Sequence, residues 1–269
     1  MEAWELANQA ARGARVELRP LTTIEDADRI LSVMIATWGE HQLLPREMIR
    51  ALSDSGNTPW GAFDGEEMIG YVLGWSGVDP DEGLHAHSHM LATLPDRRHH
   101  GVGYALKLAQ RAQCLEQGIG IVRWTFDPLL SRNAYFNLTK LGAIADRFLP
   151  NFYGEMTDTL NRGERSDRLM VRWDLEREPG GPSGAPGFEV LGRAGDDPEM
   201  PAPTDVRSPP GGSALIFIPR EYHDLRERDR GLAQRWREAT AAAFGGCFER
   251  GLVATGFTAD SAYVLTEGR

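Results

Sequence analysis

The chain has 269 residues, of which 41% are hydrophobic, enough for one large domain or for one domain with a small extra lobe. Its formal net charge of −10 argues against a duplex nucleic acid as partner, because the phosphates would repel the protein. No stretch is apolar enough to span a bilayer, residues 1–15 lack the apolar centre of a signal peptide, and the two distant cysteines lack metal-ligand spacing. We therefore expect a cytoplasmic protein with no nucleic-acid or membrane partner.

The first third of the chain predicts one strand, two helices and a β-hairpin. Residues 16–21 are suited to a strand, and Thr22 or Thr23 is placed to cap a helix with an apolar face. A second helix is expected from Pro45, because proline is favoured in the first turn of helices. Two apolar runs within residues 60–75 flank an Asp-Gly pair, which is typical of a tight hairpin turn.

Residues 84–117 predict a strand, a basic glycine turn and a long helix. Bulky residues alternate from Leu84 onward, as they do in an extended strand, and Pro95 ends this pattern. A run of good helix formers starts after Gly103.

The glycine turn is a candidate anion site. Amide N–H groups in the first turn of a helix have no partner within the helix, and the helix dipole adds positive potential there. Gly101 and Gly103 carry no Cβ that would keep a ligand from the backbone, and Arg97 adds formal charge nearby. The spacing is neither the dinucleotide pattern nor a P-loop. The residues expected to bind a diphosphate are Arg98, His99, His100, Gly101, Val102, Gly103 and Tyr104.

The Arg-x-x-Gly-x-Gly spacing of this turn, between a strand and a helix, resembles the signature of the GNAT superfamily of acyl-CoA N-acyltransferases. The resemblance implies that the amides of the turn bind the CoA diphosphate. It also implies that the pantetheine arm enters a gap between two parted strands, where a backbone N–H polarises the thioester carbonyl. The strand residues assigned to this role are Met90, Leu91 and Ala92.

Residues 131–143 resemble the second signature of that family, in which Asn and Ala precede Tyr-x-Lys-x-Gly-Phe. Asn133 and Asn137 lie one helical turn apart and are assigned to the pantetheine amides, with capping or surface polarity as the alternative. Aligned on the lysine, the tyrosine that usually protonates the departing thiolate falls on Leu138. The sequence therefore lacks the usual residue for that role.

Three histidines alternate along the predicted strand. His85, His87 and His89 project from one face of it. His87 and His89 are candidate general bases for an amine, because a neutral imidazole can accept its proton directly or through water. The alternative is a structural, hydrogen-bonded histidine. We expect no metal, because a zinc site would need a further ligand that the sequence does not make obvious.

The remaining candidates lie near the predicted acceptor site. Tyr153 is a candidate acid for the thiolate, or else a packed aromatic residue. Arg168 offers a planar fork for a carboxylate, with an internal ion pair as the alternative, and Asn161 shares its loop. In the resembled family the loop after the first helix forms one wall of the acceptor pocket, which makes Trp38 a substrate contact and Glu40 a weaker catalytic candidate.

The predicted order over residues 16–175 is β-α-α-β-β-β-α-β-α-β-β, which is also the element order of the resembled family. We therefore expect an α/β (α+β) fold with a GNAT-like central mixed, mostly antiparallel sheet flanked by helices. Eight of the 16 prolines and eight of the 30 glycines fall in residues 179–212, which predicts an irregular connector. A short strand, one long helix from Glu221 to about Arg250, and a strand pair then predict a small C-terminal β-α-β-β extension.

The expected parts are an N-terminal segment 1–15, a GNAT-like domain 16–178, the connector 179–212 and the extension 213–269. The extension is too small to bury its apolar face alone, so it docks on the main domain or on a second subunit, as in a homodimer.

The resemblance implies an N-acyltransferase that uses acetyl-CoA or another acyl-CoA, succinyl-CoA among them, as co-substrate. The amine of a small molecule or amino acid would attack the thioester directly in a ternary complex. Three alternatives remain open: a CoA-binding regulatory module without turnover, a protein lysine as acceptor, and a zinc protein built on the three histidines.

Overall fold

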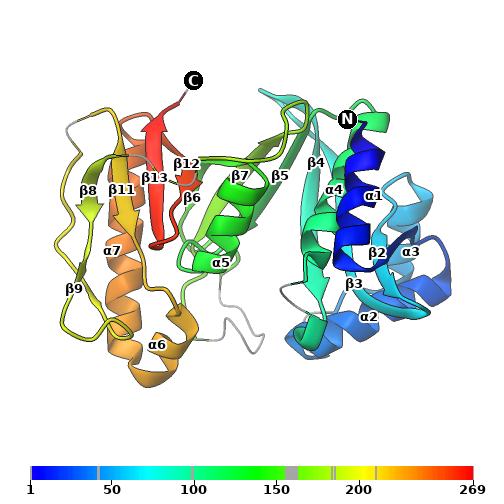
Figure 1. The fold of residues 1–269 in the computed structure, drawn as a ribbon, viewed down its shortest axis with the longest axis horizontal. Coiled ribbons are helices and arrows are strands. Elements are labelled where there is room, and N and C mark those ends of the chain that lie inside the picture. The colour runs from blue at the N-terminus through cyan, green and yellow to red at the C-terminus, as the bar shows by residue number, and fades with distance from the viewer. Residues whose placement is uncertain are drawn as a thin grey trace. The chain divides into compact units, whose positions relative to one another are not determined.

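The computed structural model describes residues 2–40, 43–97, 100–154, 163–182, 184, 186–209 and 211–268. The described chain forms two compact units, one up to Trp124 and one from Thr125 onward (Figure 1). No described helix has both the length and the apolar character needed to cross a lipid bilayer.

Five strands form the sheet of the first unit. Their bounds are β1 (Glu17–Pro20), β2 (Trp60–Asp64), β3 (Glu67–Asp79), β4 (Gly83–Thr93) and β5 (Ile121–Phe126). The first four are antiparallel neighbours in chain order, and β5 runs parallel to β4. The hairpin predicted around Asp64 and Gly65 is confirmed, because β2 and β3 meet at the pair Asp64↔Glu67.

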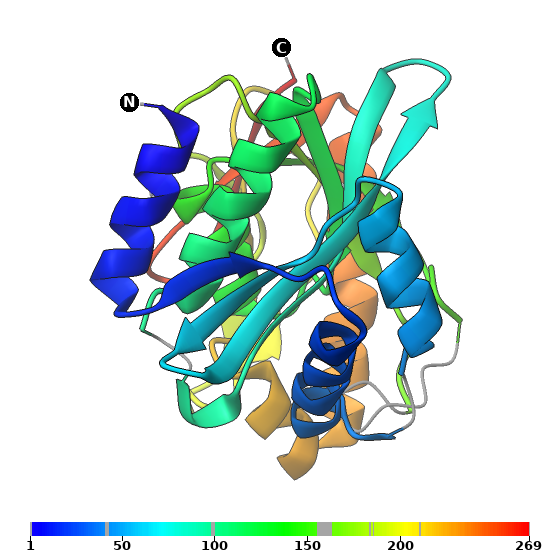
Figure 2. The ribbon, with the colours of Figure 1, turned by 90° about the vertical axis from the view of Figure 1, so that its right-hand side faces the viewer.

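Helices cover both faces of this sheet (Figure 2). The helices α1 (Ala3–Ala14) and α4 (Val102–Glu116) pack on one face, and α2 (Ile24–Trp38) and α3 (Arg46–Asp54) pack on the other. Alternation along β3 explains this, since Tyr71 and Leu73 face the α2 core whereas Val72 faces the α4 core. The predicted cap of α2 is confirmed: Thr23 and Asp26 form a reciprocal capping box.

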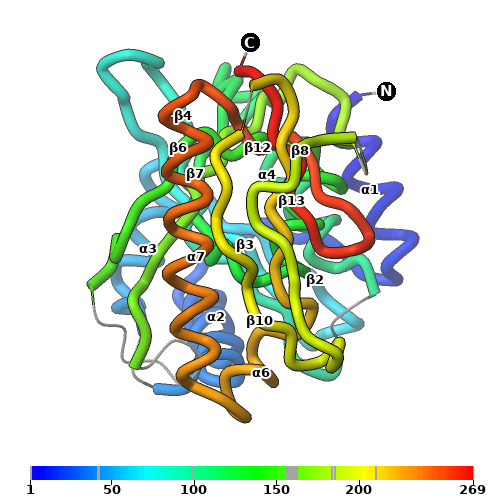
Figure 3. The backbone as a smooth tube through the Cα atoms, turned by 90° about the vertical axis from the view of Figure 1, so that its left-hand side faces the viewer, coloured from blue at the N-terminus to red at the C-terminus, as the bar shows by residue number. Residues whose placement is uncertain are grey.

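The second unit has its own six strands, in the order β7-β6-β12-β13-β11-β8. They are β6 (Ile144–Leu149), β7 (Arg168–Asp174), β8 (Phe188–Leu191), β11 (Ala214–Phe217), β12 (Leu252–Phe257) and β13 (Ala262–Glu267). The C-terminal strands extend the β6–β7 pair, since β12 joins β6 at Ala254↔Ala145. The helix α7 (Arg230–Phe248) packs along these strands (Figure 3).

The expected fold class is confirmed: the protein is a mixed α/β fold with a mainly antiparallel sheet flanked by helices. The predicted element order between residues 16 and 175 is also confirmed. The short helices within and after this region are the 3₁₀ turn η2 (Pro95–Arg97), α5 (Ser131–Ala134), the π-helix η3 (Tyr135–Lys140) and α6 (Tyr222–Arg228).

Two local predictions were wrong. The single C-terminal helix is two helices, because Asp229 is extended and its side chain caps α7 by accepting from the Leu232 N–H. Residues 179–212 are not wholly irregular: they contain β8, which pairs in parallel with β11, and the short pair β9 (Arg193–Ala194) and β10 (Ala202–Pro203).

The start of α5 has no side-chain cap. Leu130 occupies the cap position, and the Ser131 hydroxyl donates to the Pro219 carbonyl oxygen at 2.9 Å. The strand β6 ends at Leu149, and a turn follows in which Asn151 adopts a left-handed φ of 46°.

Candidate functional site

The turn before α4 presents backbone donors. Gly101 is the N-cap of α4 and has a φ of 85°, which glycine adopts without a Cβ penalty. The helical hydrogen bonds begin with the Ala105 N–H, which donates to the Gly101 carbonyl. Among the described residues, no acceptor receives the N–H groups of Val102 and Gly103. Within the described part of the chain, these two N–H groups are therefore available to an anion.

Few side chains of the described residues crowd these donors. A Cβ placed on Gly103 would meet Leu91 at 3.6 Å, an ordinary van der Waals contact. His100 is exposed, and Arg98 and His99 lie outside the described residues. Arg97 does not add the free charge expected of it, because its guanidinium pairs with Asp64 at 2.9 Å and Glu67 at 3.6 Å.

The strand before the turn parts from its parallel neighbour. β4 pairs with β3 over its whole length, but its described pairs with β5 are only Ala86↔Val122 and His87↔Arg123. The β3–β4 register shifts at His89, which gives β4 one extra residue there. Gly74 faces this bulge, and a Cβ on it would clash with the His87 carbonyl oxygen. Beyond the bulge, Met90 to Ala92 follow a strand edge that has no described partner on the β5 side.

Two of the three histidines form an aromatic cluster with Trp75. The Trp75 ring centroid lies 5.0 Å from that of His87 and 4.8 Å from that of His89. Burial, followed by the nearby His89, His85 and Lys107, lowers the pKa of His87 to about 4. Loss of hydration also lowers the pKa of His89. Both rings are therefore neutral near pH 7, and the more exposed His89 is better placed to exchange a proton with a ligand.

The third histidine does not join this cluster through any described contact, and its Nδ1 lies 3.3 Å from the Gly83 carbonyl oxygen. Within the described ranges, no group of three or more His, Cys, Asp or Glu side chains is arranged to hold a metal ion.

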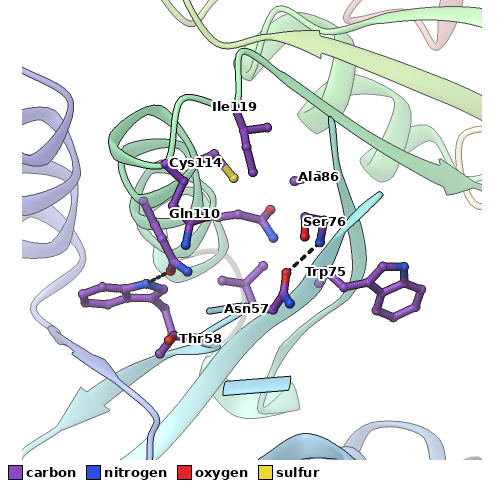
Figure 4. A pocket seen from close by; sticks show the side chains of 13 residues that line it. Asn57, Thr58, Trp75, Ser76, Ala86, Gln110, Cys114 and Ile119 are labelled. Carbon is purple, nitrogen blue, oxygen red and sulfur yellow. Dashed lines mark hydrogen bonds between the residues drawn. The ribbon is translucent and has the colours of Figure 1, made fainter. Parts of the chain in front are cut away.

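A small pocket lies between α4 and the sheet (Figure 4). Trp60 Nε1–H donates to Gln113 Oε1, and the Ser76 N–H donates to Asn57 Oδ1 at 2.6 Å, so its polar groups already bind one another. Its volume of about 30 Å³ would hold a water molecule or two, which is far too little for a CoA arm.

The second unit holds Tyr153 and Arg168. The Tyr153 hydroxyl lies 3.0 Å from Thr125 Oγ1, and its ring is exposed beside Phe152. Arg168 is buried; its Nη1–H donates to the Asp167 carbonyl oxygen at 2.8 Å and lies 3.8 Å from an Asp127 oxygen. The Asp167 carboxylate pairs with Arg165 instead. Arg168 therefore binds other groups of the protein. Its described contacts include the Asp167 carbonyl oxygen and the Asp127 carboxylate.

Sequence reasoning missed a buried charge cluster in this unit. Arg237 forms a bidentate pair with Asp127, at 2.7 and 2.9 Å, and reaches Glu164 at 2.8 Å. The Tyr222 hydroxyl donates to the other Glu164 oxygen at 2.8 Å. The Arg237 guanidinium holds the pKa of Asp127 below its usual range despite burial. The one available signal was a charged residue, Arg237, beside Trp236 in the apolar stripe of α7.

The two asparagines of the second signature are not equivalent. Asn133 on α5 is exposed, whereas Asn137 in the π-helix η3 is buried. The π turn changes the register between them, so the predicted shared face is not kept. Leu138 is 0% exposed and belongs to the core.

Two further candidates lie near the end of α2. Trp38 packs partly buried against the core of the first unit, and Glu40 is exposed. The other predicted acceptor residue, Asn161, lies outside the described residues.

Comparison with known proteins finds a family whose sequence profile resembles part of the chain. Residues 24–138, from α2 to η3, match the sequence profile of the Acetyltransferase (GNAT) family. These residues therefore resemble a GNAT acetyltransferase domain. The predicted resemblance is confirmed, and this match supports a transferase activity.

Solved GNAT structures overlap with part of the chain. The ribosomal-protein-S18-alanine N-acetyltransferase from Escherichia coli is 14% identical, covers 60% of this chain over 94% of its own length, and gives a TM-score of 0.47. Chaetomium thermophilum Naa20, solved with a bisubstrate analogue, is 19% identical. It covers 60% of this chain over 88% of its own length and gives a TM-score of 0.49. A putative acetyltransferase of the GNAT family from Desulfovibrio desulfuricans is 20% identical. It covers 60% of this chain over 99% of its own length and gives a TM-score of 0.44. No curated protein matches the chain in sequence.

Proposed function

We propose that this GNAT protein transfers an acyl group, acetyl or succinyl, from CoA to the amine of a small molecule or amino acid. The observation that carries the proposal is the pair of N–H groups of Val102 and Gly103 at the start of α4, for which the described residues offer no acceptor. Each hydrogen bond from such a group to a charged oxygen contributes about 1.5–3 kcal/mol. A diphosphate that accepts several of them would bind with about micromolar affinity.

The parted strand supports the same proposal. The edge of β4 from Met90 to Ala92 offers backbone groups to the amides of a pantetheine arm, as a neighbouring strand would. A backbone N–H there would stabilise the oxyanion that forms when an amine attacks the thioester carbonyl. The chain's own part in the reaction is to hold the thioester in line with the amine.

Two side chains are proposed to move protons. His89 accepts the ammonium proton, because its ring is neutral near pH 7 and more exposed than that of His87. Tyr153 donates a proton to the departing thiolate, since its exposed hydroxyl has Thr125 as a neighbour and Leu138 occupies the position of the usual tyrosine. Glu40 stays a weaker candidate for the base.

The experiment is release of free CoA thiol from acetyl-CoA and succinyl-CoA with a panel of primary amines and amino acids. We expect turnover with at least one amine, and a loss of ten-fold or more in His89→Gln. A matched pair of variants isolates the turn. Gly103→Val adds a branched side chain to the turn, on the side where a Cβ would meet Leu91 at 3.6 Å, and should weaken CoA binding. Gly120→Val is the control, because a Cβ there meets nothing within 4 Å.

A second candidate function is a CoA-binding module without turnover, which the buried Leu138 favours. It predicts CoA binding that Gly103→Val abolishes, with no thiol release for any amine. Absence of CoA binding would contradict both candidates.

A further inference from the structure

One buried lysine lies at the point where β4 and β5 separate. The last described pair between these strands is His87↔Arg123, so Ser88 and Trp124 are the next residues on each strand. Lys107, on α4, reaches this level: its Nζ donates to Ser88 Oγ at 2.7 Å and lies 3.8 Å from the centroid of the Trp124 ring. The Lys107 amine therefore lies in the fork between the two strands, by which we mean the point after His87 and Arg123 where β4 and β5 separate.

The surroundings of Lys107 suit an ammonium ion but lack a counter-charge. Nζ also donates to Gln110 Oε1 at 3.2 Å, so two oxygens and the negative face of an indole surround it. The residue is only 2% exposed, and no described carboxylate pairs with it. Burial lowers the pKa of Lys107 to about 7.

The start of α4, which offers the free N–H groups of Val102 and Gly103, is only one turn away from this lysine. With a rise of 1.5 Å per residue, Lys107 lies about 6–8 Å further along the helix axis. A single negative charge about 8 Å away, at an effective dielectric constant near 20, favours the protonated amine about thirtyfold. A ligand with several negative charges at the turn would act more strongly.

We propose that Lys107 couples binding of a diphosphate-bearing ligand at the start of α4 to the uptake of one proton, the ligand supplying the counter-charge that the fork lacks. Lys107 is thus a positioning residue: it acts through Ser88 on β4 and does not touch the ligand. This inference rests on the proposed function, because it takes CoA as the ligand.

Other groups near Lys107 do not supply this coupling. The titratable groups that face it are Cys114 on its own helix and His87 on β4, and burial makes both neutral near pH 7. Arg111 follows on α4, and Arg123 on β5 pairs with Glu82. Among the described residues, β3 faces α4 with Val72 and Gly74, and α1 packs on α4 through buried alanines.

The sequence makes a direct measurement simple, because Lys107 and Lys140 are its only lysines. The whole chain, labelled with 13C at lysine Cε, gives one signal for each, and exposed Lys140 is the reference. We expect the Lys107 signal to titrate with a midpoint near pH 7 in the free protein, as its pKa predicts. Saturating CoA should raise that midpoint by at least one pH unit and leave the Lys140 signal unchanged.

Calorimetry in buffers of different ionisation enthalpy measures the same proton. At pH 7.5 we expect uptake of about half to one proton per CoA. Uptake should disappear in Lys107→Met, which has no charge to gain, and in Lys107→Arg, which is always charged. If the methionine variant does not fold, the wild-type signal and the arginine variant decide the matter.

The outcomes separate this inference from the proposed function. CoA that binds without moving the Lys107 midpoint, or with the same proton uptake in both variants, overturns the inference and leaves the proposed function intact. Absence of CoA binding overturns both. A raised midpoint together with uptake that both variants abolish supports the coupling.

Discussion

The histidines of β4 are more informative in the structure than in the sequence. The alternation of His85, His87 and His89 predicted one face, but only the packing of Trp75 on two of the rings shows that they are partly desolvated and neutral. A neutral His87 links the stability of the fold to pH.

That link gives a prediction with a definite sign. The pKa of His87 falls from 6.5 to about 4 on folding, so between these values the unfolded chain binds more protons and stability decreases as the pH is lowered. After allowance for its remaining hydration, we expect a contribution of about 1–2 kcal/mol. Urea unfolding at pH 7.5 and 4.5 measures it.

His87→Gln should lose this part of the pH dependence, whereas the exposed control His100→Gln should keep it. An unaltered pH dependence in His87→Gln would show that His87 is not buried in its neutral form.

The ion pair of Asp127 and Arg237 gives a second prediction at this scale. Both side chains are buried, so loss of one partner leaves an uncompensated charge, and Asp127→Asn or Arg237→Met should each cost about 3 kcal/mol. A double-mutant cycle should give a coupling above about 1 kcal/mol. The exposed pair Arg207–Glu189, at 3.0 Å in the same unit, is the control and should give less. Equal couplings for the two pairs would contradict the buried network.

Among the elements, α4 was the most predictable because its signals are local. A glycine turn and a run of helix formers mark its start, and the structure begins the helix at Val102, just before the predicted start after Gly103, and ends it at Glu116. The α6–α7 break was not predictable, because it depends on the extended backbone of Asp229 within a sequence of helix formers. The strands β8 to β10 form through pairing with distant segments, which composition does not reveal.

The glycines at the two ends of α4 provide a matched test. Gly101 and Gly118 have φ values of 85° and 73°, so alanine at either position should cost about 1 kcal/mol of stability. Only Gly101→Ala changes the turn that presents the free amides, so only it should weaken CoA binding, by about ten-fold. Calorimetric titration with CoA and thermal unfolding measure the two effects. Equal affinities for the two variants would place the diphosphate elsewhere.

For the whole molecule, the sequence predicted the GNAT-like region and the glycine turn at the start of α4, because both depend on short, contiguous patterns. It did not reveal the Asp127–Arg237 pair, whose partners lie 110 residues apart, or the ion pairs of Arg97 with the β2–β3 hairpin. The acceptor residues were the least predictable. A side chain such as Arg168 is equally suited to bind a ligand or a neighbouring carboxylate until its contacts are known.

CoA binding as proposed depends on the N–H groups of Val102 and Gly103, for which the described residues offer no acceptor. The most direct measurement is the 1H–15N spectrum of the protein titrated with CoA, with the amides of Val102 and Gly103 assigned. The account predicts that these two signals shift downfield and saturate with micromolar affinity, and that Gly118 does not move. CoA that fails to bind, or that binds without shifting either amide, would contradict it.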